Sequence, residues 1–276
     1  MKQEQKNKPF SIPKQLIFEA WEGVRENKGS AGIDNVSIKD YEGSLSDNLY
    51  KLWNRMSSGS YFPRSVKLVE IPKKGGGRRP LGIPTVEDRI AQNTVVLHIS
   101  ERLDKVFHEN SYAYRPCRNA IDALSVARQR CWQYDWVLDM DISKFFDTID
   151  HELLMLAVKR HVSEVWILLY IERWLKVPYL YCVRSTRYET TTSERTCAAQ
   201  SASIERTMGV PQGSVIGPVL ANLFMHYVFD KWMQKYHPQI PFERYADDII
   251  CHCRTKSEAE EMQTLILVLY FHFVTA

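Results

Sequence analysis

The sequence predicts an α+β fold in which short strands carry acidic residues and long helical stretches supply the core. Two strand-like runs, Val137 to Ile142 and Phe242 to Cys251, contain closely spaced aspartates. Elsewhere apolar residues recur at helical spacing, most clearly between Val215 and Tyr236. The chain has 276 residues, 45% apolar and 25% charged, which is ordinary for a globular protein and sufficient for a sizeable core.

The first half of the chain predicts helices on either side of a strand. Residues Ile17 to Lys28 have helical spacing and are followed by Gly29, a typical helix end. Val66 to Ile71 alternates like a strand and leads into the glycine-rich, cationic loop Pro72 to Arg79. Thr85, followed by acids in the first turn, predicts the start of a long helix.

Capping residues mark helix starts in the second half. Asp150 is expected to cap one helix, and Ser214 to cap the helix from Val215 to about Tyr236. That helix is apolar on two faces, which predicts a central, buried position. Ser257 and Glu260 form a capping-box pattern at the start of the last helix.

Two segments do not fit this regular pattern. Residues 177–207 are rich in serine, threonine and arginine without a clear period, which predicts an irregular insertion. Residues Leu265 to Val274 are apolar on nearly all sides, although a terminus normally lies at the surface. We therefore expect 257–276 to be an aberrant or truncated tail.

Charge and cysteine usage narrow the class of protein. The formal net charge is +3, and the stretch from Lys51 to Arg79 carries many cations opposed only by Glu70. Such a stretch can follow a phosphate backbone or form an ordinary solvated face. No apolar run is long enough to span a membrane, and no secretory leader is evident. The six cysteines are then expected to be free thiols in the cytoplasm.

The acidic residues predict a metal site. Asp247 and Asp248 lie between strand-like runs, which suits the tip of a hairpin. Strand alternation places Asp139 and Asp141 together on one face, and a buried strand normally excludes carboxylates unless they have a partner. Asp141, Asp247 and Asp248 can together supply the oxygen ligands that Mg²⁺ prefers. Two ions held this way are typical of nucleotidyl transfer.

Six blocks, in order along the chain, resemble reverse transcriptases of the bacterial group II intron (maturase) type, and together they cover about residues 17 to 256. They are Asn27-Lys28-Gly29 through Gly32-Ile33-Asp34; Arg79-Pro80-Leu81-Gly82-Ile83-Pro84 with Asp88-Arg89; Ser111-Tyr112-Ala113-Tyr114-Arg115-Pro116; Asp141-Ile142-Ser143-Lys144-Phe145-Phe146-Asp147; Gly209-Val210-Pro211-Gln212-Gly213; and Tyr245-Ala246-Asp247-Asp248.

This resemblance implies a right-hand polymerase fold with fingers and palm, the palm being an antiparallel sheet backed by helices. Residues 1–130 would form an N-terminal extension and fingers with the first palm-proximal helices. Residues 131–256 would form the palm with its catalytic acids, including the insertion 177–207. The thumb is expected to be absent.

The resemblance also assigns catalytic and metal-binding roles. Asp141 and Asp247 match the principal ligands of two Mg²⁺ ions, Asp248 matches the third acid, and Ile142 supplies a backbone carbonyl ligand. Asp139 lies near the same motif but matches no ligand position.

Further positions match nucleotide-binding residues. Lys73 and Arg79 correspond to finger residues that grip the incoming triphosphate. Phe146 corresponds to the ring that stacks under the sugar and excludes a ribose 2′-hydroxyl. Gln212 would line the nucleotide and template pocket.

The implied activity is RNA-directed DNA polymerisation, with intron RNA as template, a DNA primer and deoxynucleoside triphosphates as partners. Two alternatives stay open. The chain could be an inactive remnant that at most binds RNA, or a retron, diversity-generating or CRISPR-associated reverse transcriptase.

Overall fold

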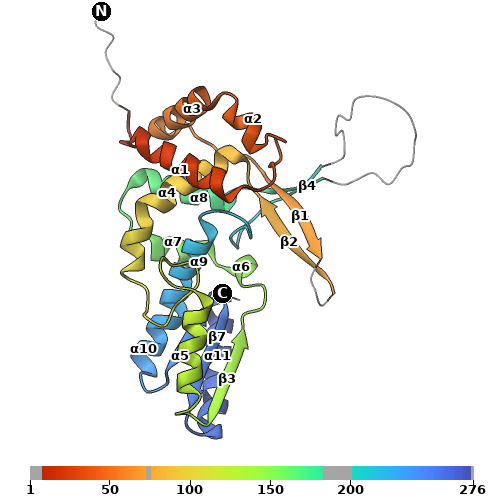
Figure 1. The fold of residues 1–276 in the computed structure, drawn as a ribbon. Coiled ribbons are helices and arrows are strands. Elements are labelled where there is room, and N and C mark those ends of the chain that lie inside the picture. Colours follow the sequence, from red (N-terminus) through yellow and green to blue (C-terminus); the bar gives the residue numbers. More distant parts are fainter. Residues whose placement is uncertain (1–7, 73–75, 183–200, 275–276) are drawn as a thin grey trace, which may run out of the picture. The chain divides into compact units, whose positions relative to one another are not determined.

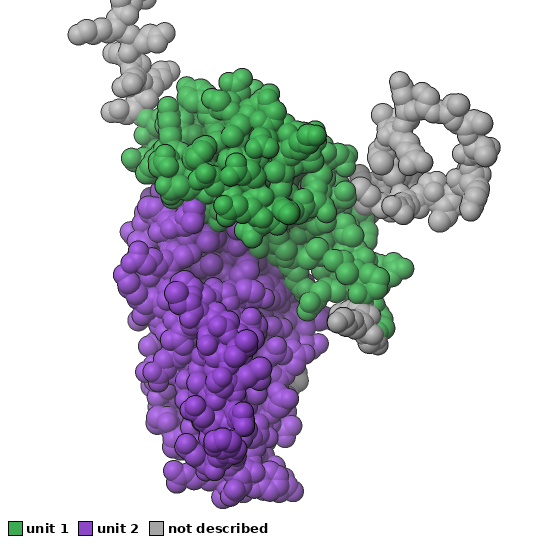
Figure 2. Space-filling view, in the orientation of Figure 1, with its two compact units in different colours: residues 1–94, 169–207, 211–214 green, residues 95–168, 208–210, 215–276 purple. Residues whose placement is uncertain are grey.

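A computed structural model describes residues 8–72, 76–182 and 201–274. The chain forms two compact units, each assembled from separate stretches of sequence (Figure 2). Unit 1 comprises residues 1–94, 169–207 and 211–214, and unit 2 comprises 95–168, 208–210 and 215–276. The division into fingers, palm and tail at residues 130 and 256 stays a prediction.

Unit 1 combines helices with a four-stranded sheet of order β2-β1-β4-β5 (Figure 1). Its helices include α1 (Lys14–Asn27), α2 (Ile38–Glu42) and α3 (Leu45–Ser58), and it contains parts of α4 (Val86–Asp104) and α8 (Val165–Lys176). The strands are β1 (Val66–Pro72), β2 (Arg78–Ile83), β4 (Tyr179–Cys182) and β5 (Ser201–Ile204). The predicted helix at 17–28 and strand at 66–71 are confirmed.

The predicted irregular insertion has a regular strand near each end, and these two strands pair with each other. Strands β4 and β5 are antiparallel partners, and β4 also pairs in parallel with β1. Residues 183–200 of the insertion lie outside the described residues. Each strand has only four residues, too few for an alternating pattern to stand out in sequence.

The core of unit 1 contains a buried polar cluster at the start of α4. Asp88 accepts hydrogen bonds from the hydroxyls of Tyr61 (2.6 Å) and Thr85 (2.7 Å). The predicted cap is confirmed, since the Asp88 N–H donates to the Thr85 hydroxyl at 3.1 Å. Burial raises the pKa of Asp88 to about 6, although its hydrogen bonds to Tyr61 and Thr85 and to the Arg64 backbone N–H oppose that rise.

Unit 2 is built on an antiparallel sheet of order β3-β7-β6, as predicted. The strands are β3 (Trp136–Asp141), β6 (Phe242–Tyr245) and β7 (Asp248–Cys253). The helices that lie wholly in this unit are α5 (Ala120–Arg130), α6 (Phe145–Thr148), α7 (His151–Lys159), α9 (Gly217–Met225), η1 (His226–Asp230), α10 (Lys231–Tyr236) and α11 (Lys256–Val274). Helix α11 contacts β3 and β7 (Figure 1), and α5 contacts β6.

The predicted central helix at 215–236 is present, and its α9 and η1 parts are largely buried, but α10 buries only Met233. Its start and its regularity also differ from the prediction. It begins at Gly217, and its N-cap is Ile216 without a side-chain hydrogen bond, so the prediction that Ser214 caps it is wrong. A proline in the first turn is compatible with a start at this point. A π-helical segment, η1, interrupts the α-helix at His226–Asp230.

Of the other two helix caps predicted in unit 2, one is confirmed and one is wrong. Asp150 caps α7 as predicted, accepting from the Leu153 N–H at 2.8 Å. At α11 the predicted Ser257–Glu260 box is wrong, because the Glu258 N–H donates to the hydroxyl of Thr255 at 3.2 Å instead. The two patterns overlap in sequence, so only the backbone position decides which threonine or serine caps.

Among the described residues, no helix has both the length and the apolar character needed to cross a membrane.

Candidate active site

The register between strands β3 and β7 brings two of the three predicted acids directly opposite each other. Asp141, the last residue of β3, pairs with Asp248, the first residue of β7. Directly opposed residues of an antiparallel pair have Cβ atoms about 4.5–5.5 Å apart and share a face of the sheet. Asp139 lies on the same face, opposite Ile250. All three aspartates are exposed.

The third acid lies in the turn between β6 and β7. Tyr245 pairs with Asp248, so Ala246 and Asp247 form the tip of the hairpin, and Asp247 is half-buried. Ala246 has φ +61°, a left-handed conformation that is costly for a residue with a Cβ atom. The predicted hairpin tip is therefore present, and it places Asp247 next to the facing pair.

Strand β3 differs from expectation in its burial. It lies at the edge of the sheet, and its acid-bearing face is exposed, so the expectation of a buried strand is wrong. Alternation does place Asp139 and Asp141 on one face, with Leu138 and Met140 on the other. The aspartates can therefore keep their charges in water without a buried counter-charge.

The proximity of these carboxylates affects the pKa of Asp248. Partial burial, followed by the negative charges of Asp141 and Asp139, raises the pKa of Asp248 above its ordinary value. The described residues contain no group of three or more histidine, cysteine, aspartate or glutamate side chains already arranged to hold a metal ion. The acids share one face and repel each other. They therefore supply the oxygen ligands of a cation site, but their side chains are not yet arranged around a metal position.

We expect Asp248→Asn to raise the melting temperature of the metal-free protein by up to about 2 °C at neutral pH, because it removes repulsion between exposed carboxylates. An acid whose pKa is raised by folding costs stability only while it is ionised. The difference between wild type and variant should therefore shrink as the pH falls through the raised pKa of Asp248. Thermal melts between about pH 4 and pH 7 check this, and a variant that melts below wild type at pH 7 would contradict it.

The segment after β3 holds the other two predicted residues of unit 2. The Ile142 carbonyl accepts a hydrogen bond from the Phe145 N–H at 3.3 Å, which leaves its second lone pair for a ligand. Phe146 is half-buried in α6, its ring 5.5 Å from that of Phe145. Its carbonyl accepts from the Val210 N–H at 2.6 Å.

Gly209 allows the motif around Val210 to approach α6 closely. It has φ +81°, and a Cβ atom there would lie 2.7 Å from the Asp147 carbonyl oxygen. The Gly209 N–H donates to the Ile149 carbonyl at 2.7 Å. No other residue type fits this position without moving the backbone.

Unit 1 contains two of the predicted nucleotide-binding positions, Arg79 on β2 and Gln212 beside it. The Gly82 N–H on β2 donates to the Gln212 carbonyl at 2.7 Å, and a Cβ atom on Gly213 would lie 2.5 Å from the Gly82 carbonyl. Arg79 is exposed on the same strand. Lys73, the other predicted contact to the triphosphate, lies outside the described residues.

Arg78 and Arg79 differ in their partners. Arg78 donates to Glu70 at 2.7 Å, and Glu70 also accepts from the Tyr181 hydroxyl at 3.0 Å. No acidic side chain among the described residues pairs with Arg79. Its guanidinium is therefore available for an anionic ligand.

Sequence reasoning missed the residues that hold the acidic hairpin. Arg244 is fully buried on the face opposite Asp248, where it forms an ion pair with Asp230 at 2.8 Å. An arginine at a core-facing strand position, on the same face as Phe242 and alternating with Glu243 and Tyr245, was the available signal. Its partners could not be found from spacing, since they come from distant segments.

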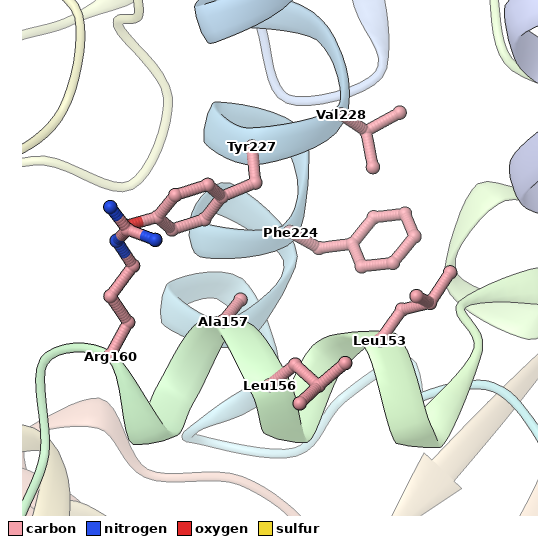
Figure 3. Close-up of a pocket in the computed structure, with 7 residues that line it drawn as sticks. All are labelled: Leu153, Leu156, Ala157, Arg160, Phe224, Tyr227 and Val228. Carbon is pink, nitrogen blue, oxygen red and sulfur yellow. The ribbon is translucent and has the colours of Figure 1, made fainter.

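A pocket elsewhere in unit 2 has a different character. It has a volume of about 210 Å³ and lies between α7 and the helix formed by α9 and η1 (Figure 3). Leu153, Leu156, Phe224 and Val228 make it largely apolar, and Arg160 lies over the ring of Tyr227 with the two centres 5.7 Å apart. None of the predicted site residues is among the residues that line it, so it is distinct from the candidate active site.

Curated relatives agree with the predicted family. The chain is 27% identical over 268 residues to Protein YkfC of Escherichia coli K12, covering 84% of this chain and 66% of that protein. It is 26% identical over 265 residues to the Group II intron-encoded protein LtrA of Lactococcus lactis subsp. cremoris, covering 91% of this chain and 41% of that protein. The chain thus spans less than two thirds of either relative.

Solved structures show the same fold at lower identity. A chain of a "Partial Cas6-RT-Cas1--Cas2 complex" matches 96% of this chain and 42% of its own length, with a TM-score of 0.51 and 20% identity. Apo telomerase from Candida tropicalis matches 72% of this chain and 45% of its own length, with a TM-score of 0.51 and 13% identity.

The family described as "Reverse transcriptase (RNA-dependent DNA polymerase)" matches residues 71–270, which include most of helix α11. The matched region contains every predicted site residue. The chain therefore belongs to the reverse transcriptase family, and it is homologous to group II intron-encoded proteins.

Proposed function

We propose that this chain is the polymerase domain of a group II intron-encoded protein, which copies intron RNA by adding deoxynucleotides to the 3′-hydroxyl of a DNA primer. The observation that carries this proposal is the β3–β7 register, which sets Asp141 against Asp248 beside a turn containing Asp247. The family match supports the same reaction.

The residues present fit two Mg²⁺ ions in their donor chemistry. Carboxylate and carbonyl oxygens are the ligands that Mg²⁺ prefers, and Asp141, Asp247, Asp248 and the Ile142 carbonyl supply them. Partial burial and, after it, the negative charges of Asp141 and Asp139 raise the pKa of Asp248, and a bound cation relieves the repulsion between these charges. When bound, the ions would favour the ionised primer hydroxyl and the leaving pyrophosphate.

The chain's own residues would bind and select the nucleotide. The guanidinium of Arg79, which pairs with no acidic side chain among the described residues, is suited to triphosphate oxygens, and Lys73 is proposed to assist it. The ring of Phe146, beside Phe145, would exclude a ribose 2′-hydroxyl by its bulk. Gln212, held at the edge of β2 through its carbonyl, would line the nucleotide and template pocket.

Template dependence tests the proposed reaction. Purified protein with Mg²⁺ and oligo(dT) annealed to poly(rA) should incorporate dTTP and reject dGTP. With oligo(dG) annealed to poly(rC) the preference should reverse, so that dGTP is incorporated and dTTP is rejected. Incorporation that ignores the template would indicate a terminal transferase and contradict the proposal.

A second candidate is an RNA-binding remnant without polymerase activity. It is favoured by one observation, namely that the described residues include no group of three or more histidine, cysteine, aspartate or glutamate side chains already arranged to hold a metal ion. The same assay separates the two candidates. Folded protein that binds RNA but extends no primer in Mg²⁺ supports the remnant.

We expect Arg79→Ala to raise the KM for deoxynucleotides by about 10- to 100-fold, because charge-assisted hydrogen bonds to the triphosphate are lost. Arg78→Ala is the matched control, since the guanidinium of Arg78 is already paired with Glu70. Steady-state extension over a range of dTTP concentrations measures both variants. Equal KM values for the two would show that Arg79 does not contact the nucleotide.

We also place the protein in the cytoplasm. Cys117, Cys131, Cys251 and Cys253 are free thiols, as is usual in a reducing compartment.

A further inference from the structure

All five side-chain N–H groups of Arg244 are used. Its Nε and Nη2 atoms each donate to one carboxylate oxygen of Asp230 at 2.8 Å. Nη2 also donates to the Ser111 hydroxyl at 2.9 Å, and Nη1 donates to Asn222 Oδ1 and to the Ala246 carbonyl, both at 3.1 Å. A guanidinium has five donors in a rigid plane, so this arrangement allows it one orientation.

The neighbours of Arg244 are also fixed. The Asn222 amide nitrogen donates to the Ala113 carbonyl at 2.6 Å, which turns its oxygen toward the guanidinium. The Arg244 backbone N–H donates to the Asn110 carbonyl at 2.8 Å, and its own carbonyl accepts from the Tyr112 N–H at 2.9 Å. The outer edge of β6 is therefore held at the residue that carries the guanidinium.

The π-helical segment η1 explains why two acceptors of Arg244, Asn222 and Asp230, lie on the same side of one helix. In an uninterrupted α-helix, residues eight positions apart, such as Asn222 and Asp230, point about 80° away from each other. The η1 segment accommodates one extra residue between them, which returns Asp230 to the side of the helix that carries Asn222. Both acceptors can then meet one guanidinium.

The Asp230–Arg244 pair is ionised in the interior. Burial disfavours the charged form of Asp230, but the charge and hydrogen bonds of Arg244 outweigh burial and hold the pKa of Asp230 below its ordinary value. An ion pair that is fully buried keeps its geometry only if its remaining donors and acceptors are satisfied. Here the fifth donor is satisfied by the carbonyl of the hairpin turn itself.

We propose that Arg244 is a positioning residue for the metal-binding acids: by holding the Ala246 carbonyl, it fixes the left-handed turn from which Asp247 and Asp248 project. The Arg244 side chain lies on the opposite face of the sheet from Asp248 and reaches the turn at the Ala246 carbonyl, so its effect on the acids passes through the turn. This inference rests on the proposed function, because it assigns a purpose to the acids in metal binding.

The test compares Arg244→Lys with wild type in three measurements. Lysine keeps the charge but cannot hold Asp230 and the Ala246 carbonyl together. We expect the Mg²⁺ concentration for half-maximal extension to rise about 10- to 100-fold, as for loss of a residue that orients metal ligands. Hydrogen exchange of the Ala246 to Asp248 amides should become faster, and Mn²⁺ binding measured by electron paramagnetic resonance should weaken.

Arg130→Lys is the matched control. Arg130 donates to the Phe242 carbonyl, to Glu243 and to Asn110 Oδ1, so it supports the same strand without reaching the turn. If both variants change the Mg²⁺ requirement and the exchange of the turn amides equally, Arg244 is only structural and the inference is overturned.

Two further comparisons keep the outcome decisive. If Arg244→Lys does not fold, Ser111→Ala removes a single acceptor and should raise the Mg²⁺ requirement by about fivefold, whereas no change would overturn the inference. If wild-type protein extends no primer, the proposed function fails, and amide exchange at the turn then decides the inference by itself. Exchange that is faster in Arg244→Lys than in Arg130→Lys supports it, and equal exchange overturns it.

Discussion

Asp141→Asn is expected to reduce primer extension about a thousandfold or more while leaving the protein folded. Asparagine keeps the shape of the side chain but removes the negative charge that faces Asp248 across the β3–β7 pair. The loss corresponds to about 4 kcal/mol of transition-state stabilisation, a reasonable share for a principal ligand in two-metal catalysis. Single-turnover extension in Mg²⁺ measures the effect.

Asp139→Asn is the matched control for that variant. Asp139 is exposed on the same face of the same strand, and it also contributes to the raised pKa of Asp248. We expect its rate to stay within a few-fold of wild type, because it matches no ligand position. Similar losses of extension rate in the two variants would contradict a ligand role for Asp141. They would mean that the reaction needs only negative charge on this face of the sheet.

Phe146→Val is expected to increase the use of ribonucleotides relative to deoxynucleotides by about 10- to 100-fold. A bulky ring rejects the 2′-hydroxyl sterically, and a smaller side chain leaves room for one extra oxygen. Phe146 is half-buried in α6, and its carbonyl is fixed by the Val210 N–H, so the backbone should tolerate the change. Competition between dTTP and UTP on poly(rA) measures the ratio.

Phe146→Tyr keeps the ring and should retain the wild-type preference. A Phe146→Val variant that still discriminates as wild type does would remove Phe146 from the site and leave it as a packing residue beside Phe145.

The acidic hairpin could be predicted because its signals are local. Asp247 and Asp248 lie between two short strands, and the alternation around Asp141 fixes which face each residue takes. These patterns need only a few neighbouring residues, and the register between β6 and β7 then follows from the turn that joins them. The capping of α4 and α7 was predictable for the same reason.

The Arg244 cluster could not be predicted because its partners are distant in sequence. Ser111, Asn222 and Asp230 belong to a loop and a helix, and their meeting depends on the π-helical segment, for which no sequence signal was recognised. The exposure of β3 was also missed, since strand alternation does not show whether a strand lies at the edge of its sheet.

The central claim is that Asp141, Asp247 and Asp248 form a metal-dependent polymerase site. The most direct measurement is single-turnover extension of oligo(dT) on poly(rA) by wild type and Asp247→Ala over a range of Mg²⁺ concentrations. The account predicts Mg²⁺-dependent extension by wild type and none by Asp247→Ala, with RNA binding equal in both. Extension that persists in Asp247→Ala, or its absence from folded wild-type protein that binds RNA, would contradict it.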